Sequence, residues 1–264
     1  MESLAARGVQ LTVVEMGDRM VPRMMGPTAG GMIKDWCEKK GVRVFTGTRV
    51  EAIEPGSALR VRLSNGQSLE ADLVISATGV KPNIGFLENS AIKCLLGVLT
   101  DEHLQTSVPG VYAAGDCAEA FDKISGKTIV SAIQPNAAEQ ARVAALNMVG
   151  QRAELRGVTQ INVLDTLGLI STSFGDWQGA PGGQHVELTD RPAGRHLSLQ
   201  FGGERLVGCN SIGWTEHVGA MRGLVEGQIK LGDWKRRLLD DPTQLMPAYL
   251  ASAQAQDRKA LVKA

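Results

Sequence analysis

The sequence lacks several features that would assign it quickly to a functional class. No apolar run approaches the roughly 20 residues that cross a bilayer, so no membrane span is predicted. The 28 basic and 28 acidic residues give a formal net charge of zero, and no basic surface predicts binding to nucleic acid. The start of the chain places Glu2 and Arg7 where a signal peptide needs an apolar core, so we expect a cytoplasmic location.

The sequence also lacks metal and disulfide motifs. Its four cysteines are far apart and form no CxxC, so we interpret each as a small buried apolar residue rather than a redox thiol. They are Cys37, Cys94, Cys117 and Cys209. The four histidines show no HExxH or Cys/His spacing. No metal site is therefore expected, and the sequence identifies no catalytic residue.

What the chain has is glycine and an ordinary share of apolar residues. With 264 residues, 43% of them hydrophobic and 21% charged, its composition is that of a globular protein of one or two domains. Its 31 glycines exceed ordinary usage. Glycine suits tight strand-to-helix turns and close approach of the backbone to a nucleotide.

Glu15 follows a buried strand predicted over residues 9–14. An acidic residue at the end of the second strand of a Rossmann unit binds the ribose hydroxyls of NAD, and a glycine fingerprint precedes it by about 20 residues. That count runs past Met1, which predicts that the chain begins inside the first helix of a dinucleotide-binding domain. The carboxylate favours NADH over NADPH because it would repel the extra phosphate, although Arg19 and Arg23 are close by and keep both cofactors open.

The most informative stretch is residues 104–116, LQTSVPGVYAAGD. A polar entry leads to Pro109-Gly110, then to a short strand predicted over residues 111–114, and then to Gly115-Asp116. Small residues before a glycine allow close backbone approach, and an aspartate there accepts hydrogen bonds from hydroxyls. The whole string resembles the second flavin-binding motif of the FAD-dependent pyridine nucleotide-disulfide oxidoreductases. The resemblance implies that Asp116 holds the ribityl chain of FAD.

Two further segments extend the resemblance. ATGVKPN, which contains Thr78 and Gly79 after a strand predicted over residues 73–75, resembles the junction between the family's NAD and FAD domains. QPNAAEQ, which contains Asn136 and Ala137, lies where the family directs a helix N-terminus at the flavin ring. In isolation, Thr78-Gly79 fits an ordinary turn after a strand, and Asn136 fits an ordinary helix N-cap.

The predicted fold class is α/β, with incomplete FAD/NAD(P)-binding Rossmann-like domains in three layers and a β-meander, followed by a C-terminal α+β interface domain. The domains expected are residues 1–80 (partial NAD-binding), 81–156 (C-terminal part of the FAD-binding domain) and 157–264 (interface). In the last, strands are predicted over residues 161–164, 169–174, 196–201 and 206–212 from alternating polarity and glycine-rich turns.

The resemblance implies an oxidoreductase that passes a hydride from NAD(P)H, with NADH favoured, through FAD to an unidentified acceptor. Without a redox cysteine pair, the chain is most similar to the ferredoxin and rubredoxin reductases and nitrite reductase flavin subunits. The resemblance also implies a homodimer formed through the C-terminal domain and an N-terminal half supplied separately. Two alternatives stay open. One is a truncated, non-catalytic dimerisation module without cofactor, and the other is a nucleotide-binding regulatory protein that uses Glu15.

Overall fold

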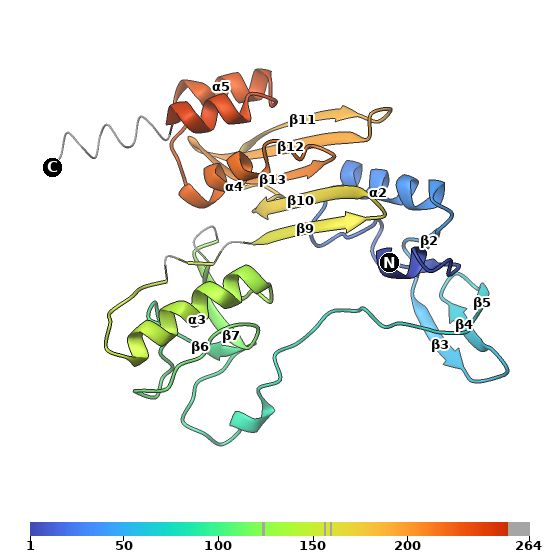
Figure 1. Ribbon diagram of the computed structural model, residues 1–264, viewed down its shortest axis with the longest axis horizontal. Coiled ribbons are helices and arrows are strands. Elements are labelled where there is room, and N and C mark those ends of the chain that lie inside the picture. The colour runs from blue at the N-terminus through green and yellow to red at the C-terminus, as the bar shows by residue number, and fades with distance from the viewer. Residues whose placement is uncertain (123–124, 156, 159, 253–264) are drawn as a thin grey trace. The chain divides into compact units, whose positions relative to one another are not determined.

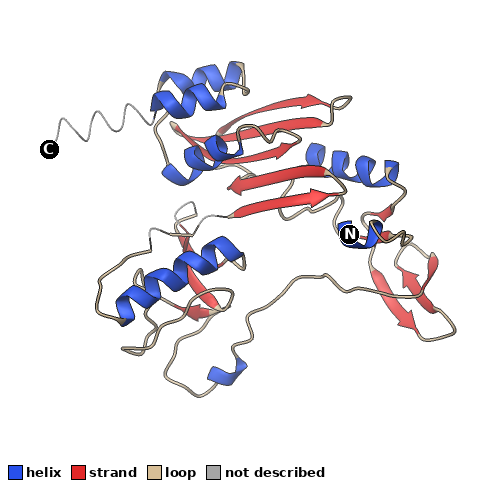
Figure 2. Cartoon of the chain, in the orientation of Figure 1, coloured by secondary structure: helices blue, strands red, loops and turns tan. Residues whose placement is uncertain are grey.

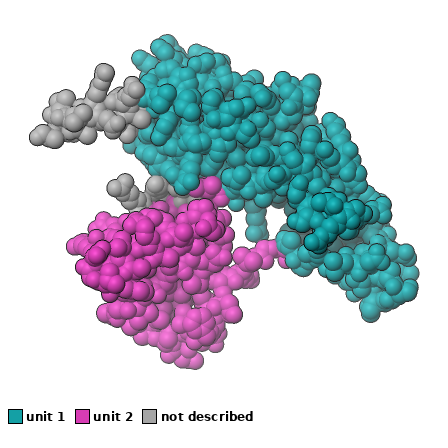
Figure 3. Space-filling view, in the orientation of Figure 1, with its two compact units in different colours: residues 1–77, 162–264 teal, residues 78–161 magenta. Residues whose placement is uncertain are grey.

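The computed structural model describes residues 1–122, 125–155, 157–158 and 160–252. The chain forms two compact units, one of residues 1–77 and 162–264 and one of residues 78–161 (Figure 3). Residues 253–264, the end of the predicted interface domain, lie outside the described residues. The architecture is mixed α/β with several separate sheets, as expected (Figures 1 and 2). The division into three domains stays a prediction.

The first unit opens with a parallel pair of strands beside a helix. α1 (Glu2–Ala5), β1 (Thr12–Val14), α2 (Pro27–Lys39) and β2 (Arg43–Phe45) follow in order, and β1 pairs with β2 in parallel. One core joins Ile33 and Cys37 of α2 to Val44 of β2 and to Met25. Pro27 is suited to the first turn of α2 because that turn has no intrahelical partner for its N–H.

The predicted meander follows. β3 (Val50–Glu54), β4 (Leu59–Leu63) and β5 (Ser68–Ala71) form an antiparallel three-stranded sheet. Gly66 has φ +82°, as the Asn-Gly turn between β4 and β5 requires. The strand predicted over residues 73–75 is wrong. In the described part of the chain no strand pairs with this segment, and Leu73 and Ile75 are 68% and 60% exposed.

A five-stranded antiparallel sheet dominates the rest of the first unit. It consists of β9 (Ile161–Thr166), β10 (Leu169–Gly175), β11 (Gln184–Asp190), β12 (Arg195–Gly202) and β13 (Arg205–Ile212), in the order β11-β12-β13-β10-β9. α4 (Val218–Gly227) packs against β10 and β13, and α5 (Asp233–Asp240) packs against β11. Residues 245–252 are also helical. The sequence predicted every strand of this sheet except β11.

Asn210 joins this sheet to the N-terminal part of the same unit. Its buried side chain accepts the Gly26 N–H at 3.0 Å and donates to the Met24 carbonyl at 2.8 Å. Trp36 of α2 makes a second connection, since its indole N–H donates to the carbonyl of Leu167 in the β9–β10 turn at 3.1 Å. The two sequence segments of the first unit therefore share one packed interior.

The second unit packs one helix against a small sheet. β6 (Val98–Leu99), β7 (Ala118–Asp122) and β8 (Lys127–Val130) form the sheet, η1 (Gly85–Leu87) is a short 3-10 turn, and α3 (Gln134–Met148) is the long helix. Leu104 and Ala120 pack with Val143 and Ala144 of α3. This core places the segment of the flavin-like motif beside α3.

The motif segment does not contain the regular strand predicted over residues 111–114. It folds back on itself around Pro109-Gly110, where Gly110 has φ +80°. The Thr106 N–H donates to the Val111 carbonyl at 2.8 Å, and the Ala113 N–H donates to the Leu104 carbonyl at 3.1 Å. Local pairing across this narrow loop occupies backbone groups that a longer strand would offer to a neighbour.

Candidate functional site

The motif ends in a turn that presents one carboxylate to solvent. Gly115 has φ +84°, a conformation that glycine adopts without strain. The Ala118 N–H closes the turn by donating to the Gly115 carbonyl at 2.9 Å. Asp116 is exposed, and its carboxylate has no hydrogen-bond or ion-pair partner in the part of the chain that the structure describes. All of its acceptor capacity is therefore available to a ligand.

The N-terminus of α3 lies next to this turn. A Cβ added at Gly115 would be 3.6 Å from the Cβ of Ala137, in the first turn of the helix. No side chain caps this helix end, and its first turn carries no acidic residue. The positive end of the helix dipole is thus not neutralised within α3 itself, which favours a nearby group with negative charge.

Asn136 does not have the alternative N-cap role considered from the sequence. Ile133 occupies the N-cap position, and Asn136 lies inside the first turn, where its amide Nδ2 donates to Ser131 Oγ at 2.8 Å. Helix formation starts earlier because Pro135 suits the first turn and its fixed φ is already helical. Gly115, Asp116, Asn136 and Ala137 are consequently gathered within the second unit.

Gln140 belongs to the same place, and the sequence interpretation missed it. Its Oε1 accepts the Gly115 N–H at 2.7 Å, and its side chain is fully buried. Glutamine is an ordinary residue in a helix interior, so its identity gives no signal. Its position four residues after Asn136, on the same face of the helix, is the only hint in the sequence.

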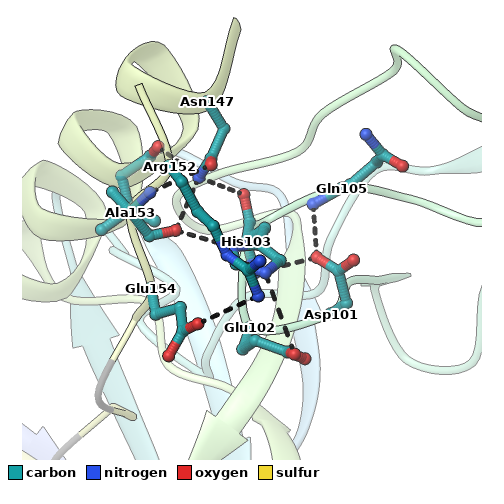
Figure 4. Close-up of polar contacts among 9 residues, drawn as sticks. Asp101, Glu102, His103, Gln105, Asn147, Arg152, Ala153 and Glu154 are labelled. Atoms are coloured by element: carbon teal, nitrogen blue, oxygen red, sulfur yellow. Dashed lines mark hydrogen bonds and ion pairs between the residues drawn. The ribbon is translucent and has the colours of Figure 1, made fainter. Parts of the chain in front are cut away.

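The C-terminal end of α3 also fixes the beginning of the motif (Figure 4). The amide Nδ2 of Asn147 donates to the carbonyls of His103 and Ala153, at 3.1 and 2.8 Å. Nδ1 of His103 lies 2.7 Å from the Ala153 carbonyl, and since a carbonyl only accepts, Nδ1 carries the proton. Asp101 Oδ1 accepts the N–H groups of His103 and Gln105. The motif is therefore held at its carboxyl end by Gln140, in the interior of α3, and at its start by Asn147, in the last turn of α3, and Ala153 just beyond it.

Glu15 lies in the other unit, at the end of β1. Its N–H donates to the Phe45 carbonyl at 2.8 Å, and its carboxylate Oε1 accepts the Gly17 N–H at 2.7 Å. Arg19 contacts Asp18 at 2.7 Å and donates to the Met25 carbonyl at 2.8 Å. The charge of Arg19 is thus already opposed by Asp18, while Glu15 remains partly exposed.

Thr78 and Gly79 open the second unit. Both are exposed, and Gly79 has φ +104°. Gly79 makes no hydrogen bond to the Gly115 turn within the described ranges. The structure therefore gathers four of the seven predicted cofactor residues within the second unit, while Glu15 belongs to the first unit and Thr78 and Gly79 lie in the exposed segment that opens the second.

The prediction that each cysteine is a small buried residue is confirmed for two of the four. All four are free, with Cys37 and Cys209 buried and Cys94 and Cys117 half-buried. Burial raises the pKa of the Cys209 thiol to about 12, so it is not a thiolate at neutral pH. Among the residues that the structure describes, no cluster of side chains has the composition of a metal site. Within the same residues, no helix combines the length and apolar character needed to cross a membrane.

A glycine turn with an exposed carboxylate lies beside an uncapped helix N-terminus, an arrangement whose chemistry suits a ligand that carries both hydroxyl groups and negative charge. The sequence pattern described as pyridine nucleotide-disulphide oxidoreductase matches residues 2–145, more than half of the chain. The chain belongs to this family, whose members are FAD-dependent NAD(P)H oxidoreductases.

Relatives and solved structures agree with this assignment. The NADH-dependent phenylglyoxylate dehydrogenase subunit epsilon of Aromatoleum evansii is 31% identical over 91% of this chain and 58% of that protein. The rubredoxin-NAD(+) reductase of Acinetobacter baylyi is 33% identical over 54% of this chain and 36% of that protein. A NAD-dependent persulfide reductase from A. fulgidus superimposes with a TM-score of 0.80 and 27% identity, covering 88% of this chain and 47% of that one. The chain thus spans about half of each of these proteins or less.

Proposed function

We propose that this chain contributes the C-terminal part of an FAD site and part of a nicotinamide-binding domain in an oxidoreductase. The enzyme would pass a hydride from NAD(P)H, with NADH favoured, through FAD to an acceptor that is not identified. One observation carries the proposal: Asp116, exposed and without a side-chain partner among the described residues, directly follows the Gly115 turn, which lies against the first turn of α3 at its uncapped N-terminus. When bound, FAD supplies the chemistry of hydride acceptance and onward electron transfer.

The residues around Asp116 fit FAD on two grounds. A carboxylate that makes no other contact can accept hydrogen bonds from the ribityl hydroxyls. The positive end of the α3 dipole, near Asn136 and Ala137, would stabilise negative charge on a reduced flavin ring. Gly115 is the residue that brings the backbone close enough to α3 for both groups to face one ligand.

Glu15 supports the preference for NADH. Its second carboxylate oxygen remains to accept a ribose hydroxyl after Oε1 has accepted the Gly17 N–H. A 2′-phosphate would meet a negative charge there, and Arg19, which already contacts Asp18, is poorly placed to compensate. We assign Thr78 and Gly79 to the passage between the two cofactor domains on the basis of the family resemblance alone.

We further propose the three-domain organisation, with Rossmann-like layers over residues 1–156 and an interface domain over residues 157–264 that pairs two copies of the chain. The antiparallel sheet has helices of its own packed on it, α4 on β10 and β13 and α5 on β11, which supports this domain assignment. Completion of the flavin site by an N-terminal segment is part of the same proposal.

The test is the visible absorbance spectrum of the purified chain before and after incubation with FAD and desalting. Once the N-terminal segment is supplied, a retained flavin band that NADH bleaches is the expected result. A chain that stays colourless with that segment present and sediments as a stable dimer would instead support the alternative, a dimerisation module without cofactor. A colourless monomer that stays colourless when the N-terminal segment is supplied would overturn both assignments.

A further inference from the structure

Gln140 combines complete burial with a single, specific hydrogen bond. It lies on α3 three residues after Ala137, about one helical turn, and its Oε1 accepts the Gly115 N–H at 2.7 Å. Its Nε2 is also buried, yet it has no hydrogen-bond partner among the described residues. The side chain therefore satisfies one backbone donor and leaves its own donor unsatisfied.

The orientation of this amide is fixed by chemistry. A backbone N–H can only donate, so the atom that faces Gly115 must be the amide oxygen, and a flipped amide would set two donors against each other. A buried donor without a partner costs free energy, whereas an apolar side chain of the same length would avoid that cost. The advantage that glutamine has over an apolar residue here is its contact with Gly115.

That contact determines where Asp116 lies. Gly115 has φ +84° and precedes Asp116 directly, and within the described residues the Asp116 carboxylate makes no hydrogen bond or ion pair that would hold it. Two hydrogen bonds to Gly115 fix the turn: its N–H donates to the side-chain Oε1 of Gln140, and its carbonyl accepts the Ala118 N–H. Of these two bonds, the first ties the turn to α3, the helix whose N-terminus lies beside it.

We propose that Gln140 is a positioning residue of the flavin site: it ties the Gly115 turn to α3 and so fixes the distance between the Asp116 carboxylate and the helix N-terminus. This inference rests on the proposed function. A preorganised carboxylate needs no ordering when the ligand binds, so loss of the tie lowers affinity without removing any group that touches the ligand.

The test compares two substitutions of similar length. Gln140→Met removes the acceptor, and Gln140→Glu keeps a carbonyl oxygen at the same position, in a carboxyl group that burial favours in its neutral form. Val143→Ala is the control, because Val143 is a fully buried core residue of the same helix. Two quantities are measured: hydrogen exchange at the Gly115 amide without flavin, and the Kd for FAD.

We expect Gln140→Met to speed exchange at Gly115 and to weaken FAD binding, each about tenfold, which is the effect of losing one hydrogen bond. Gln140→Glu should restore both quantities to within about threefold of the unmodified chain, and Val143→Ala should leave the Kd unchanged despite its lower stability. Unchanged exchange in Gln140→Met would overturn the tie itself. Faster exchange with an unchanged Kd would overturn its role in the flavin site. If the unmodified chain binds no FAD even when the N-terminal segment is supplied, the proposed function fails, and Gly115 exchange alone decides whether the tie exists.

Discussion

The two compact units bury polar side chains for different purposes. In the second unit, Glu119 accepts the N–H groups of Leu96 and Gly97, Asp122 accepts the N–H and hydroxyl of Ser125, and Gln140 accepts the N–H of Gly115. All three acceptors are at most 4% exposed, and each holds one loop. The second unit thus uses its buried polar groups to fix loop conformations.

The first unit uses buried polar groups within and between its packed layers. Thr172 and Ser211 face each other on paired strands with their hydroxyls 2.6 Å apart, and Asn210 connects the sheet to the segment before α2. These contacts join regular elements rather than shape a loop. The difference implies that substitutions in the sheet act on stability, whereas substitutions around Gly115 act on binding, and the four predictions below test that division.

The largest effect is expected at Gly208, in the middle of the sheet. A Cβ there would overlap the backbone carbonyl of Asp176, so Gly208→Ala should lower the free energy of unfolding by roughly 3 kcal/mol or more. Gly31→Ala is the matched control, because Gly31 lies in α2 with open space around it. It should raise stability by about 0.5–1 kcal/mol. Denaturant titration measures both, and equal stability of the two variants would contradict the close packing at Gly208.

Asp116→Ala should have the next largest effect, and it should fall on binding alone. Hydrogen bonds to a charged group contribute about 1.5–3 kcal/mol, so FAD affinity should fall at least tenfold. The free energy of unfolding should not change, because the carboxylate is exposed and has no partner within the described residues. Glu88→Ala, at another exposed carboxylate of the same unit, serves as the control for flavin titration. Equal FAD affinity in the unmodified chain, Asp116→Ala and Glu88→Ala would show that Asp116 does not contact FAD.

Sequence patterns predicted the elements that are buried along most of their length. β10, β12 and β13 are largely buried and are separated by glycine-rich turns, so their apolar residues and those turns predict them close to their true bounds. β11 has no such pattern, because it is an edge strand whose side chains are exposed except at Val186. The segment 73–75 has the apolar pattern of a buried strand but no neighbour to pair with, which local sequence cannot reveal.

The site was predictable only where a local motif marks it. Gly115 and Asp116 are adjacent and belong to a long recognisable string, so their roles were proposed from the sequence alone. Gln140 is 25 residues away from its partner Gly115, and only the packing of α3 on the second unit's core brings them together. Contacts between a loop and a helix of ordinary composition are set by tertiary structure, and the residue types involved do not predict them.

A smaller effect is expected on the pH dependence of stability, through His196 in the sheet of the first unit. Burial lowers the pKa of His196 below its usual value, and this outweighs the opposing influence of Glu187. The His196 imidazole is therefore protonated more easily in the unfolded chain than in the folded one. The stability that the neutral, buried imidazole contributes is present in full above about pH 6.5 and is lost as the pH falls toward the folded-state pKa. Between pH 7.5 and pH 5, the Tm of His196→Gln should decrease less than the Tm of the unmodified chain. His185→Gln, an exposed histidine on β11, should leave that slope as it is, and an unchanged slope in His196→Gln would contradict the prediction.

The smallest effect concerns Glu15, a first-unit residue whose predicted role is in binding rather than in stability. Glu15→Gln keeps an oxygen that can accept the Gly17 N–H, so the turn after β1 should keep its conformation and the Tm should not move. Loss of the charge removes the repulsion of a 2′-phosphate, and the preference for NADH over NADPH should fall a few-fold, about what one exposed charge contributes. The measurement is the ratio of Kd values for the two nucleotides, with Glu51→Gln on β3 as the control. A changed Tm with an unchanged ratio would make Glu15 a structural residue, and the division between a stabilising first unit and a binding second unit would then hold without exception.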